Sequence, residues 1–79
     1  MDRKKIFEGV KEVFRFELDA PELQLEETTS VLDLEEWDSL SHVIICKALE
    51  TRFGISITAH EMLACEDISS LIDVIDSKL

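Results

Sequence analysis

Residues 38–54 read DSLSHVIICKALETRFG, and this stretch carries the signals of a complete helix. Asp38 or Ser39 is a preferred N-cap residue, and Gly54 fits the position just after a helix end. Apolar residues recur between them at helical spacing, so we predict a helix over 39–53. The side chains expected on its buried side are Val43, Ile45, Cys46, Leu49 and Phe53.

The same periodicity predicts helices on both sides of this stretch. In residues 3–17 the apolar stripe consists of Ile6, Val10, Val13 and Phe14. After a cap at Asp67 it consists of Ile68, Leu71, Ile72, Ile75 and Leu79. Thr58 and Glu61 have the spacing of a capping box, which predicts one or two further helical turns. We therefore expect an all-α fold: a small four-helix bundle, with three principal helices and one short helix, forming a single domain over residues 1–79.

A long connection separates the first two helices. Pro21 cannot continue a helix, and residues 19–38 have no sustained helical period. Apolar residues recur there all the same, at Leu23, Leu25, Val31, Leu32, Leu34 and Trp37. We expect an ordered loop that packs on the core, and a loop this long in a small domain is usually functional.

The charge balance indicates which partners the chain attracts. It has 18 acidic and 8 basic residues, a net charge of −10, and residues 21–38 contain seven acids and no base. Such a field repels nucleic acid and anionic membranes and attracts basic protein surfaces. The acids Glu26, Glu27, Asp33, Glu35 and Glu36 lack the EF-hand pattern, so we expect no metal site. They fit a docking surface for basic partners or, equally, a plain solvated face.

The remaining composition narrows the class of protein. Cys46 and Cys65 lack the spacing of a zinc site, so we expect two reduced, buried thiols. Charges interrupt the first residues before a secretory signal could form, and no apolar run reaches the length of a membrane span. We expect a cytoplasmic monomer with one thin core and no deep catalytic cleft.

Ser39 and His42 lie one helical turn apart, which raises the question of a nucleophilic pair. No nucleophile elbow, Gly-rich oxyanion loop or orienting group accompanies them. We predict that the protein is not an enzyme and that His42 is exposed or faces a partner. On local grounds alone, Ser39 could be an ordinary helix cap.

The triplet Asp38-Ser39-Leu40, at the start of the predicted second helix, resembles the modification site of the acyl carrier protein family. Residues 48–50 and 53–55 resemble the family's continuation of that helix, and residues 28–34 resemble its loop before the site. The resemblance implies that a phosphopantetheinyl transferase attaches 4′-phosphopantetheine from coenzyme A to Ser39. It also implies that the arm carries an acyl thioester to acyl-loading and acyl-processing enzymes, namely ligases, synthases or acyltransferases.

The resemblance further implies that the acyl chain shelters between helices. The side chains expected to line such a space are Val43, Cys46, Leu49, Met62, Ile68 and Ile72. Ordinary core packing is the alternative interpretation for each of them.

The second helix departs from the family pattern, because fatty-acid carriers usually have an acid-rich helix here. Ile44 and Thr51 replace two acids, and Lys47 stands where Met is common. The residues predicted to face partners are Asp38, Leu40, Ile44, Lys47, Glu50, Glu35 and Glu36. We expect a discrete, specialised carrier for fatty-acid, polyketide or related biosynthesis. Two alternatives stay open: an aminoacyl or peptidyl carrier, whose typical Gly-Gly-x-Ser lead-in is missing, and an unmodified acidic interaction module.

Overall fold

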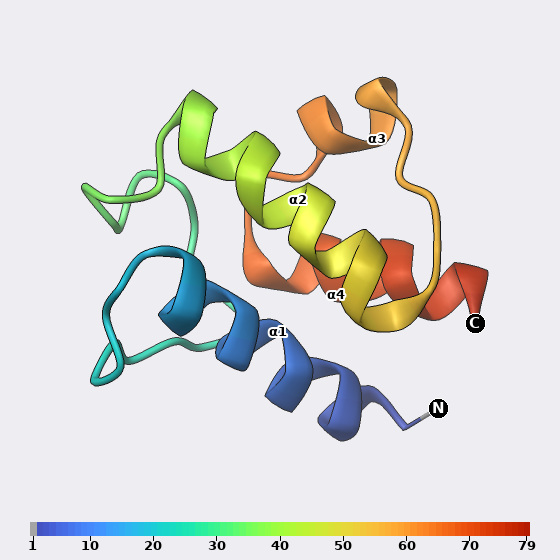
Figure 1. Cartoon of the computed structure of the whole chain (residues 1–79), viewed down its shortest axis with the longest axis horizontal. Coiled ribbons are helices and arrows are strands. Elements are labelled where there is room, and N and C mark those ends of the chain that lie inside the picture. Colours follow the sequence, from blue (N-terminus) through green and yellow to red (C-terminus); the bar gives the residue numbers. More distant parts are fainter. Residues whose placement is uncertain (1) are drawn as a thin grey trace.

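Four helices follow one another in the computed structural model, which describes residues 2–79. They are α1 (Arg3–Glu17), α2 (Ser39–Phe53), α3 (Ala59–Ala64) and α4 (Ile68–Lys78). In Figure 1, α1 runs below α2, α4 lies behind α2, and the short α3 lies above it. Apart from one isolated β-bridge between Ser30 and Asp67, no strand pairing occurs in the described chain. The prediction of an all-α bundle with three principal helices and one short helix is confirmed.

The apolar helix faces meet in one core. Its fully buried side chains include Ile6, Val10, Phe14, Ile45, Cys46, Leu49, Ile68, Leu71, Ile72 and Ile75. Gly9 lets α1 approach α2 closely, because a Cβ atom there would lie 2.7 Å from Cζ of Phe53. Gly54 ends α2 in the left-handed region, at φ 66°, as predicted for this position.

The buried side of α2 is narrower than predicted. Val43 was expected in the core but is 46% exposed, and Phe53 is only half-buried. Val43 lines an open groove next to α3 and is not packed in the core. Two further apolar residues were also assigned wrongly: Leu32 of the loop is 93% exposed, and Leu79 follows the end of α4 and is exposed.

The loop between α1 and α2 is held against the start of α4. The backbone N–H of Val31 donates to the Glu66 carbonyl at 3.0 Å, and the N–H of Ile68 donates to the Thr29 carbonyl at 3.0 Å. From the loop, Leu25 and Trp37 are buried in the core. These contacts place the end of the loop, and with it the start of α2, firmly on the bundle. Nowhere in residues 2–79 does a helix have the length and hydropathy needed to cross a bilayer.

Candidate functional site

Ser39 is the first residue of α2 and its side chain is exposed. Of the two candidate caps, the structure selects Asp38. Its Oδ1 accepts the N–H of Ser41 at 2.9 Å, and the Ser41 Oγ accepts the N–H of Asp38 at 2.8 Å. This reciprocal pair is a capping box that does not use Ser39. None of the side-chain hydrogen bonds at this helix start within residues 2–79 involves the Ser39 hydroxyl.

Opposite electrostatic effects meet at this helix end, because the Asp38 carboxylate repels an added anion while the helix terminus attracts it. The backbone N–H of Ser41 donates to Asp38 and lowers the pKa of that carboxyl group below its ordinary value, so it stays ionised at neutral pH. The first N–H groups of the 15-residue α2 and its dipole provide positive partial charge at the same end. An exposed hydroxyl in this position can accept a phosphate ester, because the helix end stabilises the added charge.

His42 has a different role from the predicted one. It was expected to be exposed or to face a partner, but it is half-buried. Its Nδ1 lies 2.9 Å from Nε1 of Trp37, and its Nε2 lies 2.7 Å from the Met62 carbonyl oxygen. An indole N–H can only donate, so Nδ1 accepts and Nε2 carries the hydrogen donated to Met62. The ring thus connects the loop, α2 and α3. Trp37 in turn packs edge-on against Phe14 of α1, with the two ring centroids 4.8 Å apart.

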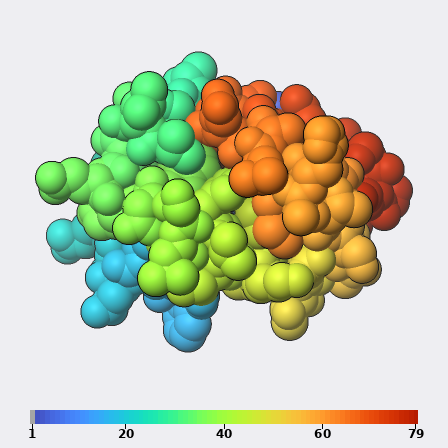
Figure 2. All heavy atoms as spheres, turned by 90° about the horizontal axis from the view of Figure 1, so that it is seen from above, coloured from blue at the N-terminus to red at the C-terminus, as the bar shows by residue number. Residues whose placement is uncertain are grey.

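A groove of about 610 Å³ opens beside Ser39, between the loop, α2 and α3. Figure 2 looks onto this face, with the loop in green and α3 in orange on either side of the yellow-green start of α2. The groove is lined by Val31, Leu32, Trp37, Asp38, Ser39, His42, Val43, Ala59, Met62, Leu63, Cys65 and Glu66. Of the six residues predicted to line a shelter, Val43 and Met62 do line it. The other four, Cys46, Leu49, Ile68 and Ile72, are packed in the closed core.

The predicted partner-facing residues occupy two kinds of position. Leu40 and Ile44 are 73% and 44% exposed, although both are large and apolar, and Lys47 is exposed as well. Glu35, Glu36 and Asp38 are exposed acids before or at the helix start. Glu50 is half-buried: its carboxylate accepts the N–H of Ile57 at 2.7 Å, and that bond lowers its pKa. Glu50 therefore also secures the chain segment after α2.

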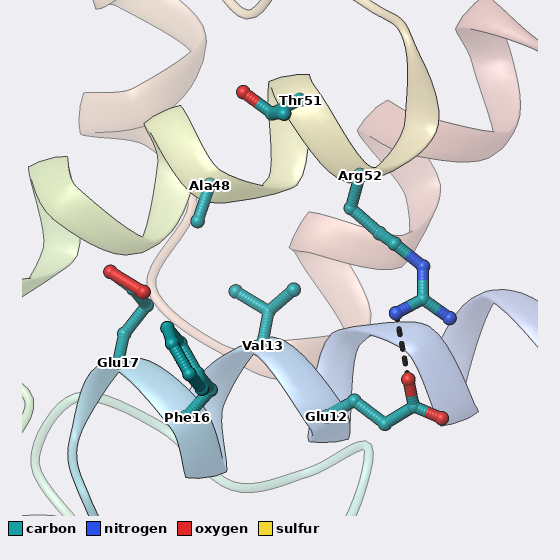
Figure 3. A pocket seen from close by; sticks show the side chains of 7 residues that line it. All are labelled: Glu12, Val13, Phe16, Glu17, Ala48, Thr51 and Arg52. Atoms are coloured by element: carbon teal, nitrogen blue, oxygen red, sulfur yellow. Dashed lines mark hydrogen bonds and ion pairs between the residues drawn. The ribbon is translucent and has the colours of Figure 1, made fainter.

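A second groove lies between α1 and the C-terminal half of α2 (Figure 3). It has a volume of about 560 Å³, and its exposed aromatic side chain is Phe16. Arg52 pairs with Glu12 across it at 2.7 Å. Of the α2 residues that line this second groove, Ala48 is the one nearest to Ser39 in the chain. At 1.5 Å per residue, the two residues are about 14 Å apart along the helix axis. The groove next to Ser39 is therefore the better placed for anything attached there.

The two cysteines are buried, as predicted. Burial raises the pKa of Cys46 to about 12 and also raises the pKa of Cys65, so both remain protonated thiols at neutral pH. In the described part of the chain, no three His, Cys, Asp or Glu side chains come together in a way that could hold a metal ion.

Sequence comparison identifies the class of protein to which this arrangement belongs. The model of one family, described as the phosphopantetheine attachment site, matches residues 8–75, which include all of α2 and α3 and the groove beside Ser39. No curated protein matches the chain. The chain therefore belongs to the phosphopantetheine attachment site family, the carrier proteins that hold 4′-phosphopantetheine covalently.

Proposed function

We propose that this protein is an acyl carrier protein whose 4′-phosphopantetheine arm is attached to Ser39, and that it is not itself an enzyme. One observation carries the assignment of the residue: Ser39 stands at a capped helix start with an exposed hydroxyl that takes no part in the side-chain hydrogen bonds there within residues 2–79. The arm would supply a terminal thiol, on which the acyl group is held as a thioester. The protein's own contribution is to hold and present that group.

The attachment step uses the position of Ser39. Its Oγ attacks the pantetheine-side phosphorus of the coenzyme A pyrophosphate, and the P–O bond to the leaving adenosine bisphosphate breaks as the new ester forms. The serine proton passes to a base on the transferase. The Asp38–Ser41 capping box fixes the first turn of α2 during this step, and the helix N–H groups stabilise the phosphodiester that results.

Partner enzymes bind, in this proposal, along the exposed side of α2. Leu40 and Ile44 offer apolar contact there, one turn apart, and Lys47 follows. Acids at the helix start, Glu35, Glu36 and Asp38, attract basic residues on the partner and speed encounter. A contact surface with this apolar centre fits a partner enzyme whose docking surface is partly apolar better than one whose docking surface is strongly basic. We therefore favour the enzymes of a specialised pathway as partners.

The groove beside Ser39 supports an acyl cargo over an aminoacyl one. Most of its lining residues are apolar, and its charged side chains, Asp38 and Glu66, are exposed. An apolar chain gains from burial along this lining, whereas an ammonium group gains only the attraction of two exposed carboxylates, which water weakens. Adenylation of an amino acid and its transfer to the modified protein would decide for the aminoacyl carrier instead.

Intact mass spectrometry tests the assignment. The protein is incubated with coenzyme A, magnesium and a broad-specificity phosphopantetheinyl transferase, beside Ser39→Ala and Ser56→Ala, the second changing an exposed loop serine. We expect one phosphopantetheinyl group on the wild type and on Ser56→Ala, and none on Ser39→Ala. A modified Ser39→Ala protein would refute the site, and an unmodified, folded wild type would favour the interaction module.

A further inference from the structure

The imidazole of His42 is one of the side chains that line the groove beside Ser39. Both ring nitrogens are engaged, one by the Trp37 indole at 2.9 Å and the other by the Met62 carbonyl at 2.7 Å. These bonds span the gap between the loop and α3, the two elements that form the groove walls. The ring is therefore held at the groove by two hydrogen bonds, and it cannot turn without losing one of them.

The space behind the ring is the closed core. Sγ of Cys46 lies 3.9 Å from Nε2 of His42, and Cys46 is fully buried. Leu49, Ile68 and Ile72, which could surround a long chain in the interior, are also fully buried. An alkyl chain that enters from Ser39 between α2 and α3 meets the imidazole before it can reach this core.

The groove itself offers apolar shelter outside the closed core. Its walls include Val43 and Met62, and Leu63 is an exposed apolar side chain at its margin. The carboxylates of Asp38 and Glu66 also line it and repel a cargo that ends in a carboxylate. The groove thus favours an apolar chain that does not end in a carboxylate.

We propose that His42 limits the length of the acyl chain that this carrier shelters, through its bridge between Trp37 and Met62, by keeping the chain out of the core, and that the sheltered cargo is an acyl group without a terminal carboxylate. The inference rests on the proposed attachment at Ser39. It makes His42 a positioning residue that acts on cargo length and has no part in attaching the arm.

A series of acyl chains tests the limit. The transferase and acyl-coenzyme A load acetyl, butyryl, hexanoyl, octanoyl and decanoyl groups, and the rate of thioester cleavage by hydroxylamine reports how well each is sheltered. In the wild type we expect the rate to fall with chain length and then to level off. In His42→Ala the rate should go on falling for about two more carbon atoms, because the cavity left by the five ring atoms has roughly the volume of two methylene groups.

Two variants control for unspecific effects. Val43→Ala enlarges the same groove without touching the bridge, so it should speed cleavage at every length while the limiting length stays unchanged. His42→Gln retains an acceptor for Trp37 and a donor for Met62, so it should restore the wild-type limit. Trp37 is the only tryptophan and lines the groove, so it gives a second readout: its emission should go on changing with chain length in His42→Ala beyond the length at which it levels off in the wild type.

The outcomes separate this inference from the proposed function. Intact mass first establishes that each protein carries its acyl group, and failure at that stage concerns the attachment at Ser39 alone. If loading succeeds but the wild type and His42→Ala share one limiting length, the role of His42 is refuted. An equal shift in Val43→Ala refutes it as well. If circular dichroism finds His42→Ala unfolded, the smaller change His42→Thr takes its place with the same expectations.

Discussion

Two serines in the first turn of α2 should respond in opposite ways to the same substitution. Ser41→Ala removes the hydroxyl that accepts the Asp38 N–H at 2.8 Å and donates to the Glu36 carbonyl at 2.7 Å. Two such bonds contribute about 1 kcal/mol each, and the higher helix propensity of Ala returns about 0.5 kcal/mol, so we expect a net loss of roughly 1 to 1.5 kcal/mol. Ser39→Ala removes a hydroxyl that takes no part in the side-chain hydrogen bonds at this helix start within residues 2–79, so its free energy of unfolding should stay within about 0.5 kcal/mol of the wild type.

Urea unfolding and transferase loading measure the two effects on the same samples. With an m value of about 1 kcal/mol/M for a chain of this size, Ser41→Ala should lower the urea midpoint by about 1 M. It should still accept the phosphopantetheinyl group below that midpoint, whereas Ser39→Ala should be as stable as the wild type and accept none. If Ser39→Ala proves as unstable as Ser41→Ala, Ser39 takes part in capping and our account of the helix start is wrong. If folded Ser41→Ala is not loaded, the division of roles between the two residues is refuted.

Three further predictions concern other parts of the fold. Gly54→Ala should lower the free energy of unfolding by about 1 kcal/mol and Gly54→Asn by less, because the residue has φ 66° and no atom nearby that a Cβ would strike; urea unfolding measures both. In the protein with its arm attached, a thiol reagent should titrate one group when folded and three when unfolded, since Cys46 and Cys65 are buried; more than one fast group would contradict this. Hydrogen bonds from the side chain and backbone of Ser70 lower the pKa of Asp67. The ionised Asp67 therefore stabilises the fold fully above its ordinary pKa of 3.8, and this contribution is lost as the pH falls through the lowered pKa. The stability difference between the wild type and Asp67→Asn should therefore shrink in acid, and a difference that does not change with pH would contradict this cause.

The helices were predictable because their signals are local. The bounds of α1 and α2, the caps at Thr58 and Asp67, and the end of α2 at Gly54 agree with the sequence-based predictions. Caps and apolar periodicity act within one or two turns, so the sequence records them directly. The choice between Asp38 and Ser39 as the cap was not predictable in this way, because both residue types serve equally well there.

The role of His42 could not be read from spacing, because its partners come from separate elements. Trp37 belongs to the loop and Met62 to α3, twenty residues further along the chain than His42. Only the packing of the loop and α3 against α2 brings them within hydrogen-bond distance. One signal was available: a buried indole N–H needs an acceptor, and Trp37 precedes a helix whose first turn contains one histidine.

The first turn of α2 satisfies two requirements that normally conflict. A carrier needs an attachment point that is rigid relative to its body, yet the attached hydroxyl has to remain accessible to a transferase. Here the residues on both sides of Ser39 provide the rigidity: Asp38 and Ser41 close the capping box, while Trp37 and His42 fix the turn to the core and to α3. Ser39 takes part in neither set of bonds, so its side chain can stay exposed while its backbone is held from both directions. The same division explains why a substitution at Ser39 should abolish loading without loss of stability, whereas one at His42 should change the cargo and leave loading intact.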